Sequence, residues 1–108
     1  MDGFLLTFYT TQNRVYQGQN IAEWLFAVAR QMQLRGGTVL RGSQGLDHQG
    51  QVHSAHFFEL ADQPVQIQFA VTEQQAKALL DYLNSQQLSL FYVKTPIEFG
   101  CVGQVKED

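Results

Sequence analysis

The chain has 108 residues, of which 44% are hydrophobic and 16% charged, and its formal net charge at pH 7 is -3. This length predicts a single domain over residues 1–108 with one hydrophobic core. The acidic balance and the thinly scattered Lys and Arg residues argue against a nucleic-acid partner and against attraction to a membrane surface.

The chain contains one cysteine, Cys101, which cannot form a disulfide within the chain. The segment that opens the chain has an apolar patch but no basic flank, so it does not resemble a signal peptide. No stretch approaches the roughly 18 apolar residues of a transmembrane helix, so we expect no direct membrane insertion. A cytoplasmic location follows as the expectation.

The first predicted elements are a strand, a loop and a helix. Residues 4–9 read FLLTFY, a strand with apolar residues on both faces, and residues 10–19 read as a polar loop. Asn20 is expected to cap a helix, with Glu23 reaching back to complete a capping box. Gly36 and Gly37 are expected to end this helix. Its apolar residues recur at helical spacing at Ile21, Leu25, Val28, Ala29 and Met32.

Residues 38–71 are predicted to hold strands separated by a glycine-containing loop. Residues 38–40 form a short strand, residues 41–51 form a mobile loop, and residues 52–60 are a strand candidate. A turn at residues 62–64 leads into residues 65–71, where apolar residues alternate with glutamine and alanine. This alternation is the clearest strand pattern in the chain.

A second helix and a final strand complete the expected order. Thr72 is expected to cap the helix with Gln75 as its reach-back partner, and the helix is expected to end near Asn84. Residues 88–93 read LSLFYV, a strand that we expect Pro96 to break. The helix buries Ala76, Leu79, Leu80 and Leu83.

This order predicts an α+β fold of the ferredoxin-like kind. It is a βαββαβ sandwich with an extra strand and a long loop after the second strand. Two helices can cover only one face of such a sheet.

The uncovered face of the predicted sheet is rich in apolar side chains. Alternation places Leu5 and Tyr9 opposite Leu6 and Phe8, and Phe91 opposite Leu90 and Tyr92. An exposed patch of this kind exceeds what soluble monomers usually carry. We therefore expect a homo-oligomer that packs sheet against sheet. The alternative is a monomer in which the extra strand or the tail crosses that face.

Residues 41–45, with the sequence RGSQG, are a candidate anion site. Glycines allow successive backbone N–H groups to turn toward one point, and Arg41 adds a fixed positive charge. The same spacing of glycines also occurs in plain turns.

Three histidines, His48, His53 and His56, lie close together in the sequence beside Asp47. On a strand, His53 and His56 point to opposite faces, and the group has no recognised ligand spacing, so no metal site is predicted. An alternative hypothesis remains a small ferredoxin-like enzyme, using His53 or His56 with Tyr9, or a metal-binding trimer. Paired carboxylates for acid–base catalysis are not evident, and an inert thiol is expected at Cys101.

Several motifs resemble the PII-like proteins of domain-of-unknown-function family 190. They are TVLRG at residues 38–42, the glycine at position 45, VHSA at residues 52–55 and GQNIAEWL at residues 18–25. The strand followed directly by a helix over residues 64–83 is similar to the equivalent part of true PII signalling proteins. The resemblance covers residues 4–96.

The resemblance implies a trimeric regulatory protein and not an enzyme. It implies a small effector, such as an adenine nucleotide, bound at clefts between subunits, and a loop at residues 41–52 that contacts an unidentified partner protein such as a membrane transporter or an enzyme. The implied ligand-binding residues are Arg41, Gly42, Ser43, Gln44, Gly45 and Lys94. The implied partner loop is Leu46, Asp47, His48, Gln49, Gly50 and Gln51.

The chain departs from true PII proteins after the second helix. Residues 84–88 read NSQQL, with no glycine or lysine where those proteins have a second phosphate loop, and Lys94 and Lys106 are the basic groups that follow. A less highly charged ligand than a triphosphate, such as a monophosphate or a cyclic nucleotide, is therefore expected.

Overall fold

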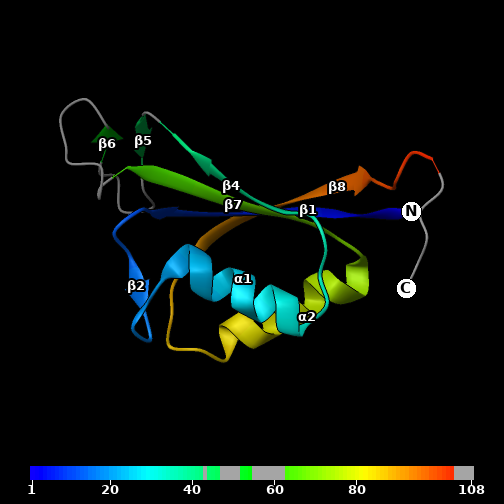
Figure 1. Ribbon diagram of the computed structural model, residues 1–108, viewed down its shortest axis with the longest axis horizontal. Coiled ribbons are helices and arrows are strands. Elements are labelled where there is room, and N and C mark those ends of the chain that lie inside the picture. The colour runs from blue at the N-terminus through cyan, green and yellow to red at the C-terminus, as the bar shows by residue number, and fades with distance from the viewer. Residues whose placement is uncertain (43, 47–51, 55–62, 104–108) are drawn as a thin grey trace.

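A four-stranded antiparallel sheet with both described helices on one face forms the centre of the molecule (Figure 1). The computed structural model describes residues 1–42, 44–46, 52–54 and 63–103. The strands are β1 (Asp2–Thr11), β4 (Gly37–Arg41), β7 (Pro64–Val71) and β8 (Phe91–Glu98), in the spatial order β4-β7-β1-β8. The helices are α1 (Ile21–Gln31) and α2 (Glu73–Asn84). This order and connectivity confirm the ferredoxin-like α+β prediction.

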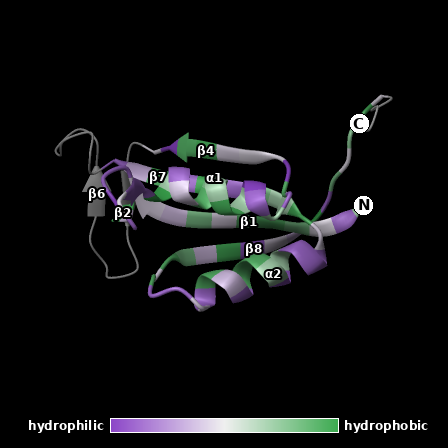
Figure 2. Ribbon diagram, turned by 60° about the horizontal axis from the view of Figure 1, so that its bottom comes forward, coloured by the Kyte–Doolittle hydropathy of each residue, from purple (hydrophilic) through white to green (hydrophobic). Residues whose placement is uncertain are grey.

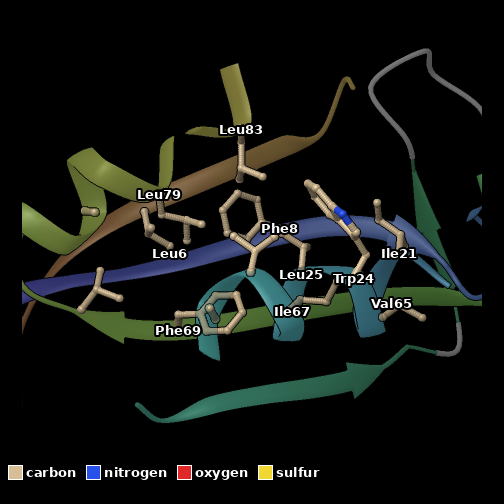
Figure 3. Packing of buried hydrophobic residues seen from close by; sticks show 14 residues of the cluster. Leu6, Phe8, Ile21, Trp24, Leu25, Val65, Ile67, Phe69, Leu79 and Leu83 are labelled. Atoms are coloured by element: carbon tan, nitrogen blue, oxygen red, sulfur yellow. The ribbon is translucent and has the colours of Figure 1, made fainter. Parts of the chain in front are cut away.

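The core lies between the helices and the sheet (Figure 3). In β1 and β7 every second residue points toward the helices, as the period of two requires. Figure 2 shows that both helices combine hydrophobic and hydrophilic residues, which is typical of helices that cover a sheet. The buried hydrophobic residues of the sheet are Leu6, Phe8, Val65, Ile67, Phe69 and Val71, and those of the helices include Ile21, Trp24, Leu25, Val28, Leu79 and Leu83.

Helix α1 begins where the sequence predicts but ends before the glycines that were expected to end it. The Asn20 side chain accepts a hydrogen bond from the Ala22 N–H at 3.0 Å, which confirms the cap. Among the described residues Glu23 makes no bond back to Asn20, so the predicted capping box is wrong for this helix. The last helical residue is Gln31, not the residue before Gly36. Gln33 takes the left-handed conformation that the glycines were expected to supply, with φ of 61°.

Residues predicted as the first loop contain a small hairpin. Strands β2 (Val15–Tyr16) and β3 (Gln19–Asn20) pair across a two-residue turn. Gln17 and Gly18 both have positive φ, at 52° and 78°, as a type I′ turn requires. The sequence did not indicate this pair, because strands of two residues are too short to show an alternating pattern in a polar segment.

A second hairpin follows β4, and its first strand falls within the segment expected to be a loop. Strand β5 (Gln44–Leu46) pairs with β6 (Val52–Ser54), so part of the predicted 41–51 loop is a strand. The predicted strand at 52–60 is described only as far as Ser54. Residues 43, 47–51 and 55–62 lie outside the described residues.

The capping box predicted for α2 is confirmed. The Thr72 hydroxyl accepts from the Gln75 N–H at 3.1 Å, and the Gln75 side chain accepts from the Thr72 N–H at 2.9 Å. The helix ends at Asn84, as expected.

The predicted bounds of the last strand are wrong. Residues 88–90 precede β8, which runs through Pro96 to Glu98. In the described sheet β8 is an edge strand paired with β1. A proline is tolerated on an edge because that strand needs hydrogen bonds on one side only.

Candidate functional site

The candidate anion site begins at the end of edge strand β4. Arg41 is paired with Val65 of β7, which is itself paired with Thr10 of β1, so these three residues form one row across the sheet. Val65 is buried in the core and therefore marks the helix-facing side of the row. Because paired residues share a face, Arg41 also lies on that side, where its side chain is exposed to solvent.

Hydrogen bonds hold both the backbone next to Arg41 and the Arg41 side chain. The Gly42 N–H donates to the Pro64 carbonyl at 2.8 Å, which extends the attachment of β4 to β7 by one residue. The Arg41 Nε donates to the Gln12 Oε1 at 3.1 Å. The guanidinium therefore has a defined direction although it is exposed.

Two further residues of the predicted anion site, Gln44 and Gly45, lie in strand β5. Gln44 pairs with Ser54 and Gly45 pairs with His53. Ser43 lies outside the described residues. Of the predicted partner loop, Leu46 lies in β5 opposite Val52, and residues 47–51 are not described.

Lys94 lies at the opposite edge of the sheet from Arg41. It belongs to β8, where it is paired with Leu6, and its ammonium lies 4.1 Å from the centre of the Phe4 ring. Strands β7 and β1 separate β8 from β4. One chain therefore does not bring Lys94 and Arg41 together, and a site that uses both requires more than one chain.

Of the residues named in the alternative hypotheses, Tyr9 and His53 lie in described strands. Tyr9 lies on the sheet face without helices and packs against Phe91, with ring centres 5.6 Å apart. His53 is in β6, and His48 and His56 are outside the described residues. Within the described ranges, no group of three or more His, Cys, Asp or Glu side chains could hold a metal ion. Cys101 is exposed.

A cleft that the sequence did not indicate lies where β1 and β8 meet the start of α2. Its volume is about 450 Å³, and its walls include Phe4, Pro96 and the three acidic residues Asp2, Glu73 and Glu98. Glu98 is a lone acid in the sequence, and only the pairing of β1 with β8 places Asp2 beside it. The negative charge of these walls disfavours an anionic ligand.

Gln12 is the second feature that the sequence did not indicate. Its backbone N–H donates to the Gln63 carbonyl at 2.9 Å, and its carbonyl accepts from the Asn20 side chain at 2.8 Å. No local motif marks a glutamine in a polar loop as the partner of an arginine 29 positions later.

Among the described residues, two basic side chains have shifted pKa values. Burial lowers the pKa of Arg14, which follows β1 and whose carbonyl accepts from the Ile21 N–H at 2.9 Å. A hydrogen bond from Lys77 to Asp81, together with the charge of Asp81, raises the pKa of Lys77 on the exposed side of α2. Both groups remain cationic at physiological pH.

The sheet order and the two covering helices define a ferredoxin-like α+β protein. Residues 3–94 match the family DUF190, which is described as an uncharacterized ACR. Because this match spans most of the sequence, the chain belongs to that family. No protein with a curated description matches it.

Two solved structures share the fold at low sequence identity. The chain is similar to CPII, a nitrogen regulatory PII-like protein from Thiomonas intermedia K12 bound to ADP, AMP and bicarbonate, with 16% identity and a TM-score of 0.60 over 90% of this chain and 89% of that one. It is also similar to a PII-like protein from Thermus thermophilus, with 12% identity and a TM-score of 0.62 over 89% and 87% of the two chains. In the described part of the chain, neither helix has the length and apolar character needed to cross a bilayer.

Proposed function

We propose that this chain is a cytoplasmic PII-like regulatory protein that binds a small anionic effector, and that it is not an enzyme. The observation that carries the proposal is the oriented, solvent-exposed guanidinium of Arg41 at the end of an edge strand, beside an anchored Gly42. A fixed guanidinium next to a glycine backbone suits recognition of a phosphate group.

The effector class that fits best is an adenine nucleotide with one or two phosphates. CPII, which shares the fold, is bound to ADP and AMP. Arg41 and Lys94 are the predicted cationic residues, and each supplies one charge. Two charges match a monophosphate or a diphosphate more closely than a triphosphate.

The proposed assembly is a homotrimer with the effector in the clefts between subunits. Arg41 and Lys94 lie at opposite edges of one sheet, so two subunits placed edge to edge could supply both groups to one ligand. The segment at residues 41–52 would contact a partner protein, such as a transporter or an enzyme. The effector would favour one state of that segment because the protein binds the effector more tightly in that state.

The test is a binding series with AMP, ADP, cyclic AMP and ATP, measured by calorimetry and by amide hydrogen exchange. We expect AMP or ADP to bind and to protect amides between residues 41 and 52. Replacing Arg41→Ala should weaken binding by roughly tenfold or more, because hydrogen bonds to charged groups contribute about 1.5–3 kcal/mol.

The matched control is Arg35→Ala, which removes another exposed arginine close to β4. Its affinity should equal that of the wild type. If none of the four nucleotides binds or changes the exchange of residues 41–52, the nucleotide form of this proposal is wrong.

A further inference from the structure

A hydrogen bond connects two strands that are not neighbours in the sheet. Gln12 follows the last residue of β1, and Arg41 is the last residue of β4, yet β7 lies between these strands. The bond from Arg41 Nε to Gln12 Oε1, at 3.1 Å, therefore spans the beginning of β7. It links the proposed effector-binding cation to the segment that leads into α1.

The backbone of Gln12 is held from two sides. Its N–H donates to the Gln63 carbonyl, and its carbonyl accepts from the Asn20 side chain, which also caps α1. Both bonds use backbone atoms of Gln12, whereas the bond with Arg41 uses its side-chain oxygen. The glutamine side chain can therefore be changed without removing either attachment of the backbone.

We propose that Gln12 is a positioning residue that selects how Arg41 presents its guanidinium to the effector, and this rests on the function proposed above. A guanidinium can offer two parallel donors to a phosphate either from its end, through both terminal nitrogens, or from its side, through Nε and one terminal nitrogen. Because Gln12 occupies Nε, the end-on pair remains available. A guanidinium already fixed in this direction loses less freedom when the anion binds.

The neutrality of Gln12 is part of the inference. An amide oxygen orients the guanidinium and leaves its full positive charge for the effector. A glutamate at the same position would form an ion pair with Arg41 and compete with the phosphate. Gln12→Ala removes the orientation alone, whereas Gln12→Glu retains an acceptor but cancels the charge.

The first experiment needs no ligand. The Arg41 Nε–H resonance is observed by NMR in the wild type, in Gln12→Ala and in Gln31→Ala, which removes an exposed glutamine at the end of α1. We expect faster solvent exchange and a changed shift in Gln12→Ala only. An unchanged Arg41 resonance in Gln12→Ala overturns the inference.

The second experiment measures ADP affinity by calorimetry for the same proteins, for Gln12→Glu, for Arg41→Ala and for the double variant. We expect about three- to tenfold weaker binding for Gln12→Ala, the range for having to order one side chain on binding, and at least about tenfold for Gln12→Glu. In the Arg41→Ala background, Gln12→Ala should have no further effect, because it acts through that arginine.

The outcomes separate the two proposals. If Arg41→Ala weakens binding while both Gln12 variants bind like the wild type, the inference is wrong and the proposed function stands. If Gln12→Ala weakens binding equally with and without Arg41, its role is only structural and the inference is wrong. If the wild type binds no ADP, the proposed function fails for this ligand and the inference fails with it.

Discussion

At the scale of single residues, the end of α1 depends on one glutamine in an unfavourable conformation. Gln33 has φ of 61°, where a side chain carries a steric cost. Its N–H donates to the Arg30 carbonyl at 3.0 Å, and the Leu34 N–H donates to the Ala29 carbonyl at 2.9 Å. These two bonds form the pattern that usually places glycine at this position.

Replacing Gln33→Gly should therefore stabilise the protein. Removing a left-handed side chain recovers about 1–2 kcal/mol, and the greater freedom of glycine in the unfolded chain offsets about 0.5–1 kcal/mol, which leaves a gain of up to about 1.5 kcal/mol. Urea denaturation measures the change. Gln31→Gly, in the last helical turn, should lower the stability instead. A loss of stability in Gln33→Gly would contradict this account of the helix end.

At the scale of elements, the start of α2 is set by a reciprocal pair of hydrogen bonds between Thr72 and Gln75. We expect Thr72→Ala to lower the free energy of unfolding by about 1 kcal/mol, the usual loss for a helix cap. The control is Gln74→Ala, an exposed residue of the same turn. Equal stability of the two variants in urea would show that the cap does not stabilise this helix.

The pairing of β1 with β7 requires a glycine at position 3. A Cβ there would clash with the Val71 carbonyl oxygen and would lie 2.6 Å from the Phe99 ring. Gly3→Ala should therefore destabilise the protein by about 1–3 kcal/mol, the usual cost of overpacking. At Gly100 a Cβ meets no atom within 4 Å, so Gly100→Ala is the control. A thermal melt distinguishes them, and equal melting temperatures would refute the close approach.

At the scale of the whole molecule, the sheet face without helices carries an exposed apolar patch. Its members come from three strands, and cross-strand pairing places them on one side: Leu40 at 45% exposure, Tyr9 at 38%, Phe91 at 52% and Val93 at 39%. Burying one such side chain fully contributes about 1.5–3 kcal/mol. Association through this face would therefore be favourable.

We expect Phe91→Lys to dissociate the proposed trimer. A charge at the most exposed member of the patch would have to be buried without a partner. Val15→Lys, at an exposed apolar residue of the β2–β3 hairpin, is the control. Sedimentation equilibrium of both variants and the wild type gives the mass. A wild-type mass of 12.3 kDa in dilute solution would contradict association.

The predictions from sequence succeeded where local patterns are long or reciprocal. The alternation in β7 and the Thr72–Gln75 pair follow from strand geometry and capping chemistry, and both appear as expected. The bounds of the last strand were predicted wrongly because a distant segment decides them. Strand β8 extends past Pro96 because β1 offers pairing partners as far as Asp2.

The candidate site shows the same division. The composition of residues 41–45 was sufficient to single out Arg41 as an anion-binding candidate. The same composition could not indicate Gln12, because the hydrogen bond between Arg41 and Gln12 spans 29 positions and depends on the order of three strands. It could not indicate that Lys94 lies at the opposite edge of the sheet either.

The amino-acid sequence alone determined the fold class, because residue periods and caps act over a few neighbouring positions and survive without tertiary contacts. Only the tertiary structure decided which charged groups of the candidate site are neighbours. Sheet order and register place residues together irrespective of their separation along the chain, and no local pattern encodes that placement.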